Sequence, residues 1–126
     1  MGGVADIVAV QGPLTWVIEC KLSMGIALME QAAGWIGQAN YVSVAIPYVR
    51  HNVFCRRVLK WLGIGILEVA ADTSYRTDQH GSAVKEETRP RLSRKVKGKL
   101  RAALCEAHKT YAEAGNNQGR RWSPFK

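Results

Sequence analysis

Two runs of β-forming residues, separated by a tight turn, constrain the fold of this chain more than any other feature. Residues 4–10 and 16–21 are rich in Val, Ile and Trp, and the pair Gly12-Pro13 between them is typical of a chain reversal. A hairpin symmetric about this pair joins residues whose numbers sum to 25, which sets Asp6 opposite Glu19. Directly opposed residues of a hairpin have Cβ atoms about 5 Å apart.

The opposed carboxylates predict a cation site. Two negative charges at this distance repel each other unless a cation lies between them. Lys21 lies two residues beyond Glu19, on the same face of the strand, which indicates chemistry on an anion at that cation. In the alternative interpretation, Asp6 is an edge-strand charge, and Glu19 and Lys21 form a surface ion pair worth under about 1 kcal/mol.

The rest of the chain predicts one α/β domain with a small mixed β-sheet flanked by helices. Alternation of strands and helices makes the later connections parallel crossovers. A polar stretch over 71–91 is typical of a flexible linker, and apolar residues at helical spacing from Leu92 predict a basic amphipathic helix, followed by a basic-aromatic tail. The predicted units are an α/β core over 1–70, a linker over 71–91 and the C-terminal helix and tail over 92–126. Within the core we expect helices over 24–38 and 52–62, with Val53 facing inward, and strands over 41–47 and 63–69.

Length and composition exclude several classes of protein. The 126 residues suffice for one domain with a hydrophobic core, and no apolar run reaches the roughly 18 residues of a membrane span. The start of the chain lacks the basic region and cleavage pattern of a secretory signal. Three cysteines, an odd number without paired spacing, are typical of reduced thiols. We therefore expect a cytoplasmic protein without a membrane partner.

The positive charge is concentrated in the second half of the chain. The net charge is +8, and residues 71–126 hold thirteen of the eighteen Lys and Arg. Seven of these basic residues form a cluster between residues 89 and 101 that contains no acidic residue. Such a cluster favours a polyanionic partner, and we expect DNA, with RNA not excluded. The alternative is a solvated charged tail. The expected nucleic-acid contacts are Arg89, Arg91, Arg94, Lys95, Lys97, Lys99 and Arg101, with Arg120, Arg121 and Trp122 of the tail.

The arrangement resembles a known superfamily of nucleases. Asp6 on one strand, Glu19-Cys20-Lys21 on the next, and a helix with Gln31 and Trp35 resemble the PD-(D/E)XK superfamily over roughly the first 70 residues. The helix pattern is similar to that of the RecB-type exonuclease and VRR-Nuc branches, and the small basic chain is similar to Holliday-junction resolvases. The resemblance implies a restriction-endonuclease-like core and a phage or prophage source.

The resemblance also implies a function and residue roles. Asp6, Glu19 and the backbone carbonyl of Cys20 would bind Mg²⁺, with Mn²⁺ as a substitute. Lys21 would position or deprotonate the attacking water or neutralise developing charge, and Gln31 would orient the lysine, the water or a phosphate oxygen. The implied activity is metal-dependent endonucleolytic hydrolysis of DNA phosphodiester bonds, with selectivity for branched or flapped DNA.

One departure from the superfamily leaves a second function open. The chain begins five residues before Asp6, where the superfamily has a further helix and strand. Either the start is truncated, or a neighbouring subunit or the C-terminal helix replaces these elements. Because the core is incomplete, we expect a homodimer. The alternative function is a non-catalytic module of the nuclease fold that binds nucleic acid or protein, such as a phage anti-host protein in the host cytoplasm.

Overall fold

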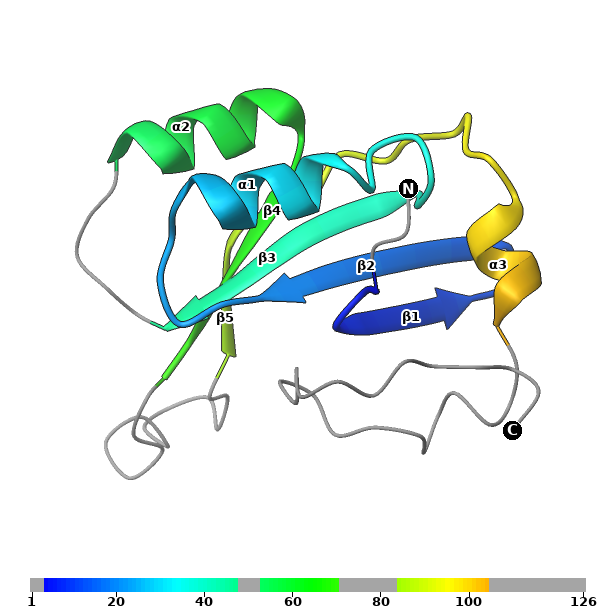
Figure 1. Cartoon of the computed structure of the whole chain (residues 1–126), viewed down its shortest axis with the longest axis horizontal. Coiled ribbons are helices and arrows are strands. Elements are labelled where there is room, and N and C mark those ends of the chain that lie inside the picture. Colours follow the sequence, from blue (N-terminus) through cyan, green and yellow to red (C-terminus); the bar gives the residue numbers. More distant parts are fainter. Residues whose placement is uncertain (1–3, 48–52, 71–83, 105–126) are drawn as a thin grey trace.

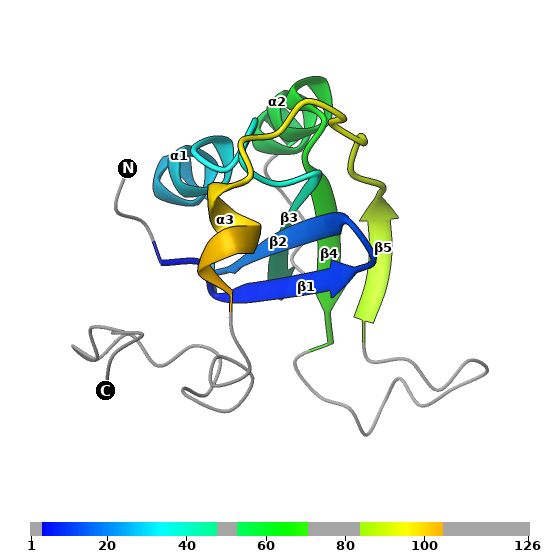
Figure 2. The same ribbon diagram turned by 90° about the vertical axis from the view of Figure 1, so that its right-hand side faces the viewer.

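The computed structural model describes residues 4–47, 53–70 and 84–104, and within them a five-stranded sheet carries two helices on one face (Figure 1). The short third helix lies at the end of the sheet where β2 begins (Figure 2). The small mixed sheet of an α/β fold is thereby confirmed. The elements in chain order are β1 (Ile7–Gln11), β2 (Leu14–Cys20), α1 (Ile26–Ala33), β3 (Tyr41–Pro47), α2 (Val53–Leu62), β4 (Gly65–Val69), β5 (Val84–Thr88) and α3 (Lys99–Ala103).

The strands follow one another across the sheet in sequence order, β1 to β5. Strand β1 pairs antiparallel with β2, while β2, β3 and β4 are mutually parallel and β5 returns antiparallel to β4. The helices α1 and α2 form the two crossovers between parallel strands, as expected from the alternation of elements. Because both helices follow parallel strands, both begin at the edge of the sheet where β2 and β3 end (Figure 1).

The core lies between the sheet and the two helices. Alternate residues of β2 are buried, so that Val17 faces the helices, and Leu28 of α1 and Leu59 of α2 meet it from the other side. These three side chains are between 0% and 1% exposed. Side chains repeat with a period of two residues in the strands and about 3.6 in the helices, and this places apolar side chains on the facing sides of the sheet and the helices.

Both helices differ in detail from the prediction. Helix α1 ends at Ala33 rather than at residue 38, and Gly37 adopts a φ of 83° in the turn that follows. Helix α2 ends in a Schellman motif, in which the Gly63 N–H donates to the Lys60 carbonyl and the Ile64 N–H to the Leu59 carbonyl. The inward placement of Val53 is wrong, because this side chain is 68% exposed.

The predicted linker over 71–91 is corrected at its C-terminal part, since Val84–Thr88 forms the edge strand β5. Residues 71–83 lie outside the described residues. Arg56 of α2 connects this strand to the rest of the fold, because its guanidinium donates to Glu68 of β4 at 3.1 Å and also contacts Glu87 of β5. Tertiary contacts of this kind stabilise a strand whose own sequence, Val-Lys-Glu-Glu-Thr, carries no apolar alternation.

The predicted helix from Leu92 is wrong over its first residues. Residues 89–98 run irregularly across the end of the sheet before α3 begins at Lys99 (Figure 2), and we name the segment 89–101, which includes the start of α3, the basic strap. The backbone N–H groups of Arg91, Ser93 and Lys97 donate to carbonyls of other elements, those of Gly63, Asn40 and Gly37, at 2.8 to 2.9 Å. These donors are therefore not available for helical hydrogen bonds. Residues 105–126 lie outside the described residues.

Candidate active site at the end of strand β2

The hairpin register brings Asp6 and Glu19 together as predicted. Ile7 pairs with Ile18 and Val8 with Val17, and each pair sums to 25. Asp6 is the next residue before β1, and its Oδ2 accepts a hydrogen bond of 2.8 Å from the backbone N–H of Cys20. The carboxylate of Asp6 is thus held beside the last two residues of β2 by the backbone itself.

Glu19 is a buried carboxyl group with one strong donor. The residue is 3% exposed, and its Oε1 accepts a hydrogen bond of 2.6 Å from the indole N–H of Trp35. The pKa of Glu19 is raised to about 7, mainly by burial and also by the charge and hydrogen bonding of Asp6, against the opposing effects of Trp35 and Lys21. Near neutral pH this carboxyl therefore exchanges a proton readily.

Cys20 and Lys21 follow Glu19 in the sequence and differ in their electrostatics. Lys21 follows β2 directly, and its backbone N–H donates to the Ala45 carbonyl of β3 at 3.1 Å. Its ammonium group favours the charged form of Glu19, which places the positive charge near the carboxyl pair. Burial, followed by the charges of Asp6 and Glu19, raises the pKa of the Cys20 thiol, which keeps the thiol protonated and unsuited to nucleophilic attack.

Gln31 does not join this cluster in the described part of the chain. It lies on the exposed side of α1, whose buried side carries Leu28 and Ala32, and no hydrogen bond connects it to Asp6, Glu19 or Lys21. The expected role of Gln31 in orienting Lys21 therefore has no contact to support it. Its expected contacts with the attacking water or a phosphate oxygen stay predictions.

Trp35 makes a contact at the candidate site that the sequence interpretation did not assign to it. The sequence predicts a core residue on the helix over 24–38; Trp35 lies just beyond α1, and its ring does pack against the core cluster. The indole N–H also orients the Glu19 carboxyl. A buried indole N–H usually has an acceptor, and Glu19 is among the few acceptors on the buried faces of the predicted strands.

The basic strap lies at the opposite end of the sheet from the carboxylates. It hydrogen-bonds to residues that precede β3 and β4, whereas Glu19 is near the end of β2. The seven residues of β2 separate the two ends by about 20 Å at the usual rise per residue. The seven predicted nucleic-acid contacts of the strap all lie in the described part and are all exposed, whereas Arg120, Arg121 and Trp122 lie outside it.

The carboxyl groups of the site suit the Mg²⁺ ion that the resemblance implies. Within residues 4–47, 53–70 and 84–104, no three His, Cys, Asp or Glu side chains converge on one point. Mg²⁺ is usually bound by only one or two carboxylates and retains several waters, so the pair of Asp6 and Glu19 fits it by chemistry. The like-charge repulsion that raises the pKa of Glu19 is also what a dication would relieve.

Comparison with known proteins adds no family to this description. No protein-family model matches the chain, and no curated protein or solved structure matches it. None of the described helices is long and apolar enough to cross a membrane. The function is therefore inferred from the residues of the site.

Proposed function

We propose that this protein is a Mg²⁺-dependent nuclease that hydrolyses DNA phosphodiester bonds. The observation that carries the proposal is the opposition of two carboxyl groups, Asp6 and Glu19, beside Lys21 at the end of β2. An antiparallel hairpin that bears both carboxylates, followed by a helix and a parallel strand, is also consistent with a PD-(D/E)XK-like core. The proposal extends to selectivity for branched or flapped DNA.

Each residue of the site would have a separate role in hydrolysis. Asp6, Glu19 and the backbone carbonyl of Cys20 would hold Mg²⁺, which when bound polarises a phosphoryl oxygen and neutralises developing negative charge. Trp35 positions one oxygen of Glu19 through its indole N–H. Lys21 supplies a positive charge next to the carboxylates and would orient a water or a phosphate oxygen. Gln31 would contact the substrate from the exposed side of α1.

The raised pKa of Glu19 predicts how Mg²⁺ affinity and activity depend on pH. A carboxyl binds a metal ion in its ionised form, so the affinity for Mg²⁺ should rise with pH through about 7, the pKa of Glu19. The activity should rise over the same range. A rise centred near pH 4.5, the ordinary value for a glutamate, would contradict this role for Glu19.

Cleavage of DNA tests the proposal directly. Supercoiled plasmid and a four-way junction are incubated with Mg²⁺, Mn²⁺ or EDTA, using wild-type protein, Glu19→Gln and Lys21→Ala. We expect metal-dependent cleavage that falls at least about 100-fold in both variants, since even outer partners of a metal site are typically worth 10- to 100-fold. The matched control is Glu30→Gln, which changes an exposed glutamate of α1 and should leave cleavage unchanged. Cleavage that persists in Glu19→Gln would refute the proposal.

A second candidate function is a nuclease-like module that binds nucleic acid or protein without cutting it. The observation that favours it is the deep burial of Glu19, whose carboxyl is already engaged by Trp35. A protonated Glu19 could then serve only to join the hairpin to the turn that follows α1. Thermal unfolding at pH 8 with and without Mg²⁺ separates the two functions without relying on activity. A metal that binds the native state raises the midpoint in wild type but not in Glu19→Gln, whereas the binding module predicts no rise in either.

A further inference from the structure

The outer face of helix α2 carries two large aromatic side chains in solvent. Phe54 is 74% exposed and Trp61 is 79% exposed, and their spacing of seven residues places them on one side of the helix. Arg57 and Lys60 are also exposed between them, and the helix contains no acidic residue. Large apolar side chains that share one exposed face are more informative than a single exposed residue, and such patches mark interaction sites.

The basic strap continues this surface beyond the end of the helix. The Arg91 N–H donates to the Gly63 carbonyl at 2.8 Å, and its guanidinium reaches the carbonyl of Trp61 at 3.4 Å. The side chain of Arg91 lies so close over Gly63 that a Cβ on this glycine would be 3.0 Å from the Cβ of Arg91. Arg91 is thus anchored beside the aromatic residue at the end of α2, where the helix dipole also favours a cation.

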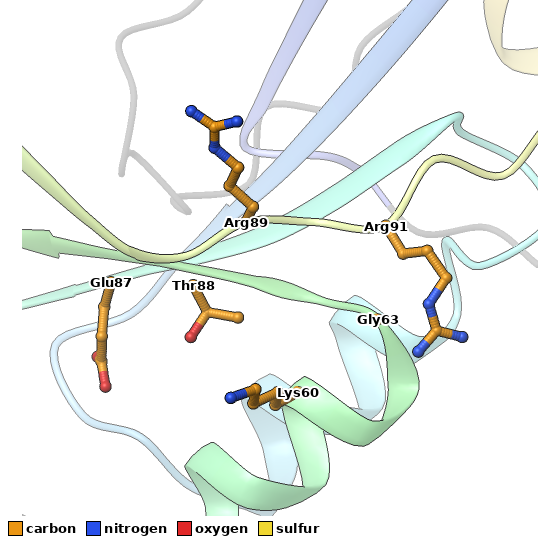
Figure 3. Close-up of a pocket in the computed structure, with 6 residues that line it drawn as sticks. All are labelled: Lys60, Gly63, Glu87, Thr88, Arg89 and Arg91. Atoms are coloured by element: carbon orange, nitrogen blue, oxygen red, sulfur yellow. The ribbon is translucent and has the colours of Figure 1, made fainter.

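A concave site of 390 Å³ lies where the helix and the strap meet (Figure 3). Lys60, Thr88, Arg89 and Arg91 line it together with Glu87, and this volume is within the range of pockets that bind small ligands. Glu87 contacts Arg56, a cation that it shares with Glu68. Among the described residues neither Lys60 nor Arg91 forms an ion pair, so two cations remain for an anion such as a phosphate group.

We propose that this surface, formed by Phe54, Arg57, Lys60 and Trp61 of α2 with Arg91 of the strap, binds single-stranded nucleic acid. Bases stack on the two aromatic rings, and phosphate groups contact the three cations. The rings are about 10 Å apart along the helix, at 1.5 Å per residue, so an unpaired strand can place separate bases on each of them. Paired bases do not expose their faces to such rings. A protein partner is disfavoured by Lys60, because lysine is depleted at the centre of protein interfaces.

This inference goes beyond the proposed nuclease activity and does not require it. The test therefore measures binding in EDTA, with a fluorescein-labelled 15-nucleotide oligo(dT) and a duplex of the same length, by fluorescence anisotropy. Trp61→Ala should weaken binding of oligo(dT) about tenfold, within the range of about 5- to 150-fold for the loss of one stacked base, and should change duplex binding less than twofold. Trp61→Phe should retain oligo(dT) binding, because it keeps a ring.

Two further variants separate stacking from charge and from general surface effects. Arg57→Gln should reduce the slope of log affinity against log salt by about 0.7, the value for one phosphate contact on a single strand, whereas Trp61→Ala should leave the slope unchanged. Val10→Ala is the matched control, since it truncates a 48% exposed side chain on β1, the far edge strand of the sheet, and should change nothing. Equal unfolding midpoints would show that the variants fold.

Three outcomes would overturn the inference. Oligo(dT) affinity unchanged in Trp61→Ala would remove the stacking role. An equal loss on single strand and duplex would indicate a general electrostatic effect. A self-association of the wild type that Trp61→Ala abolishes, without any loss of oligo(dT) binding, would assign the surface to a second copy of the chain. Because no metal is present, none of these results depends on whether the protein cleaves DNA.

Discussion

At the level of single residues, the chemistry centres on two carboxyl groups that face each other in an environment that disfavours two negative charges. Asp6 accepts a hydrogen bond from the backbone of Cys20, and Glu19 accepts one from Trp35. Burial is the largest cause of the raised pKa of Glu19, and Asp6 adds to it. A proton or a divalent cation can relieve the repulsion, so proton release and metal binding are coupled at this pair.

This coupling predicts an unusual dependence of stability on pH. The pKa of Glu19 is about 7 in the folded protein and near 4.5 when unfolded, so the native state binds the proton more tightly. The contribution of Glu19 to the free energy of unfolding is therefore highest below pH 4.5, falls as the pH rises to about 7, and stays low above it. The loss should be on the order of 3 kcal/mol.

Glu19→Gln should remove this dependence, because an amide mimics the protonated acid. Its oxygen can still accept from Trp35 and its NH₂ can donate to Asp6. Urea unfolding at pH 5 and pH 8 should show the variant more stable than wild type at pH 8 by about 1–3 kcal/mol and close to it at pH 5. Parallel pH profiles of wild type and variant would contradict the assignment, and Glu30→Gln should follow wild type.

At the level of elements, the basic strap is held in place by close approach of its backbone to the sheet. Asn40 is central to this contact, because its side-chain oxygen accepts from the Thr15 N–H and its NH₂ donates to the Ser93 carbonyl, both at 2.9 Å. Gly65 at the start of β4 leaves room for Pro90 to pass. A Cβ on Gly65 would lie 2.5 Å from the Ser43 hydroxyl and 2.7 Å from Cδ of Pro90.

Gly65→Ala should therefore destabilise the protein by about 1–3 kcal/mol, the usual cost of overpacking a well-packed region. The added methyl carbon would also lie 2.8 Å from the backbone nitrogen of Pro90, which leaves little freedom to relax. Gly98→Ala is the control, because a Cβ there meets no atom within 4 Å, and its effect should stay within about 0.5 kcal/mol. Equal urea midpoints for the two variants would show that the strap does not pass as closely as described.

At the level of the whole molecule, charge is separated along the sheet. The carboxylates lie at the end of β2, and the strap crosses the opposite end, about 20 Å away. Basic residues of the strap cannot therefore neutralise the phosphate at the scissile bond directly. If the protein cuts DNA, the strap contacts the same molecule several base pairs from the bond.

Mutations in the strap should therefore change DNA binding without changing Mg²⁺ binding by the carboxyl pair. The combined variant Arg94→Gln, Lys95→Gln and Lys97→Gln should weaken duplex binding and reduce its salt slope by up to about 2.7, if each side chain neutralises one phosphate. The rise in thermal midpoint caused by Mg²⁺ should not change, because the carboxylates are distant. A salt slope equal to that of wild type would mean that the strap is a solvated surface.

Local sequence patterns were sufficient to predict the hairpin and the order of the main elements. The turn at Gly12-Pro13 and the β-forming runs on both sides of it set the register that opposes Asp6 and Glu19. The alternation of strands and helices predicted the parallel crossovers. These features depend on residues that are close in the sequence, where periodicity and turn chemistry act directly.

The remaining features depend on contacts between residues far apart in the chain. Strand β5 forms because β4 offers an edge and Arg56 offers a cation to Glu87. The strap avoids a helix because carbonyls of Gly63, Asn40 and Gly37 accept its N–H groups. Trp35 reaches Glu19 across sixteen residues of sequence. No local pattern encodes such partners, because each hydrogen bond is defined only once the sheet and helices have packed together.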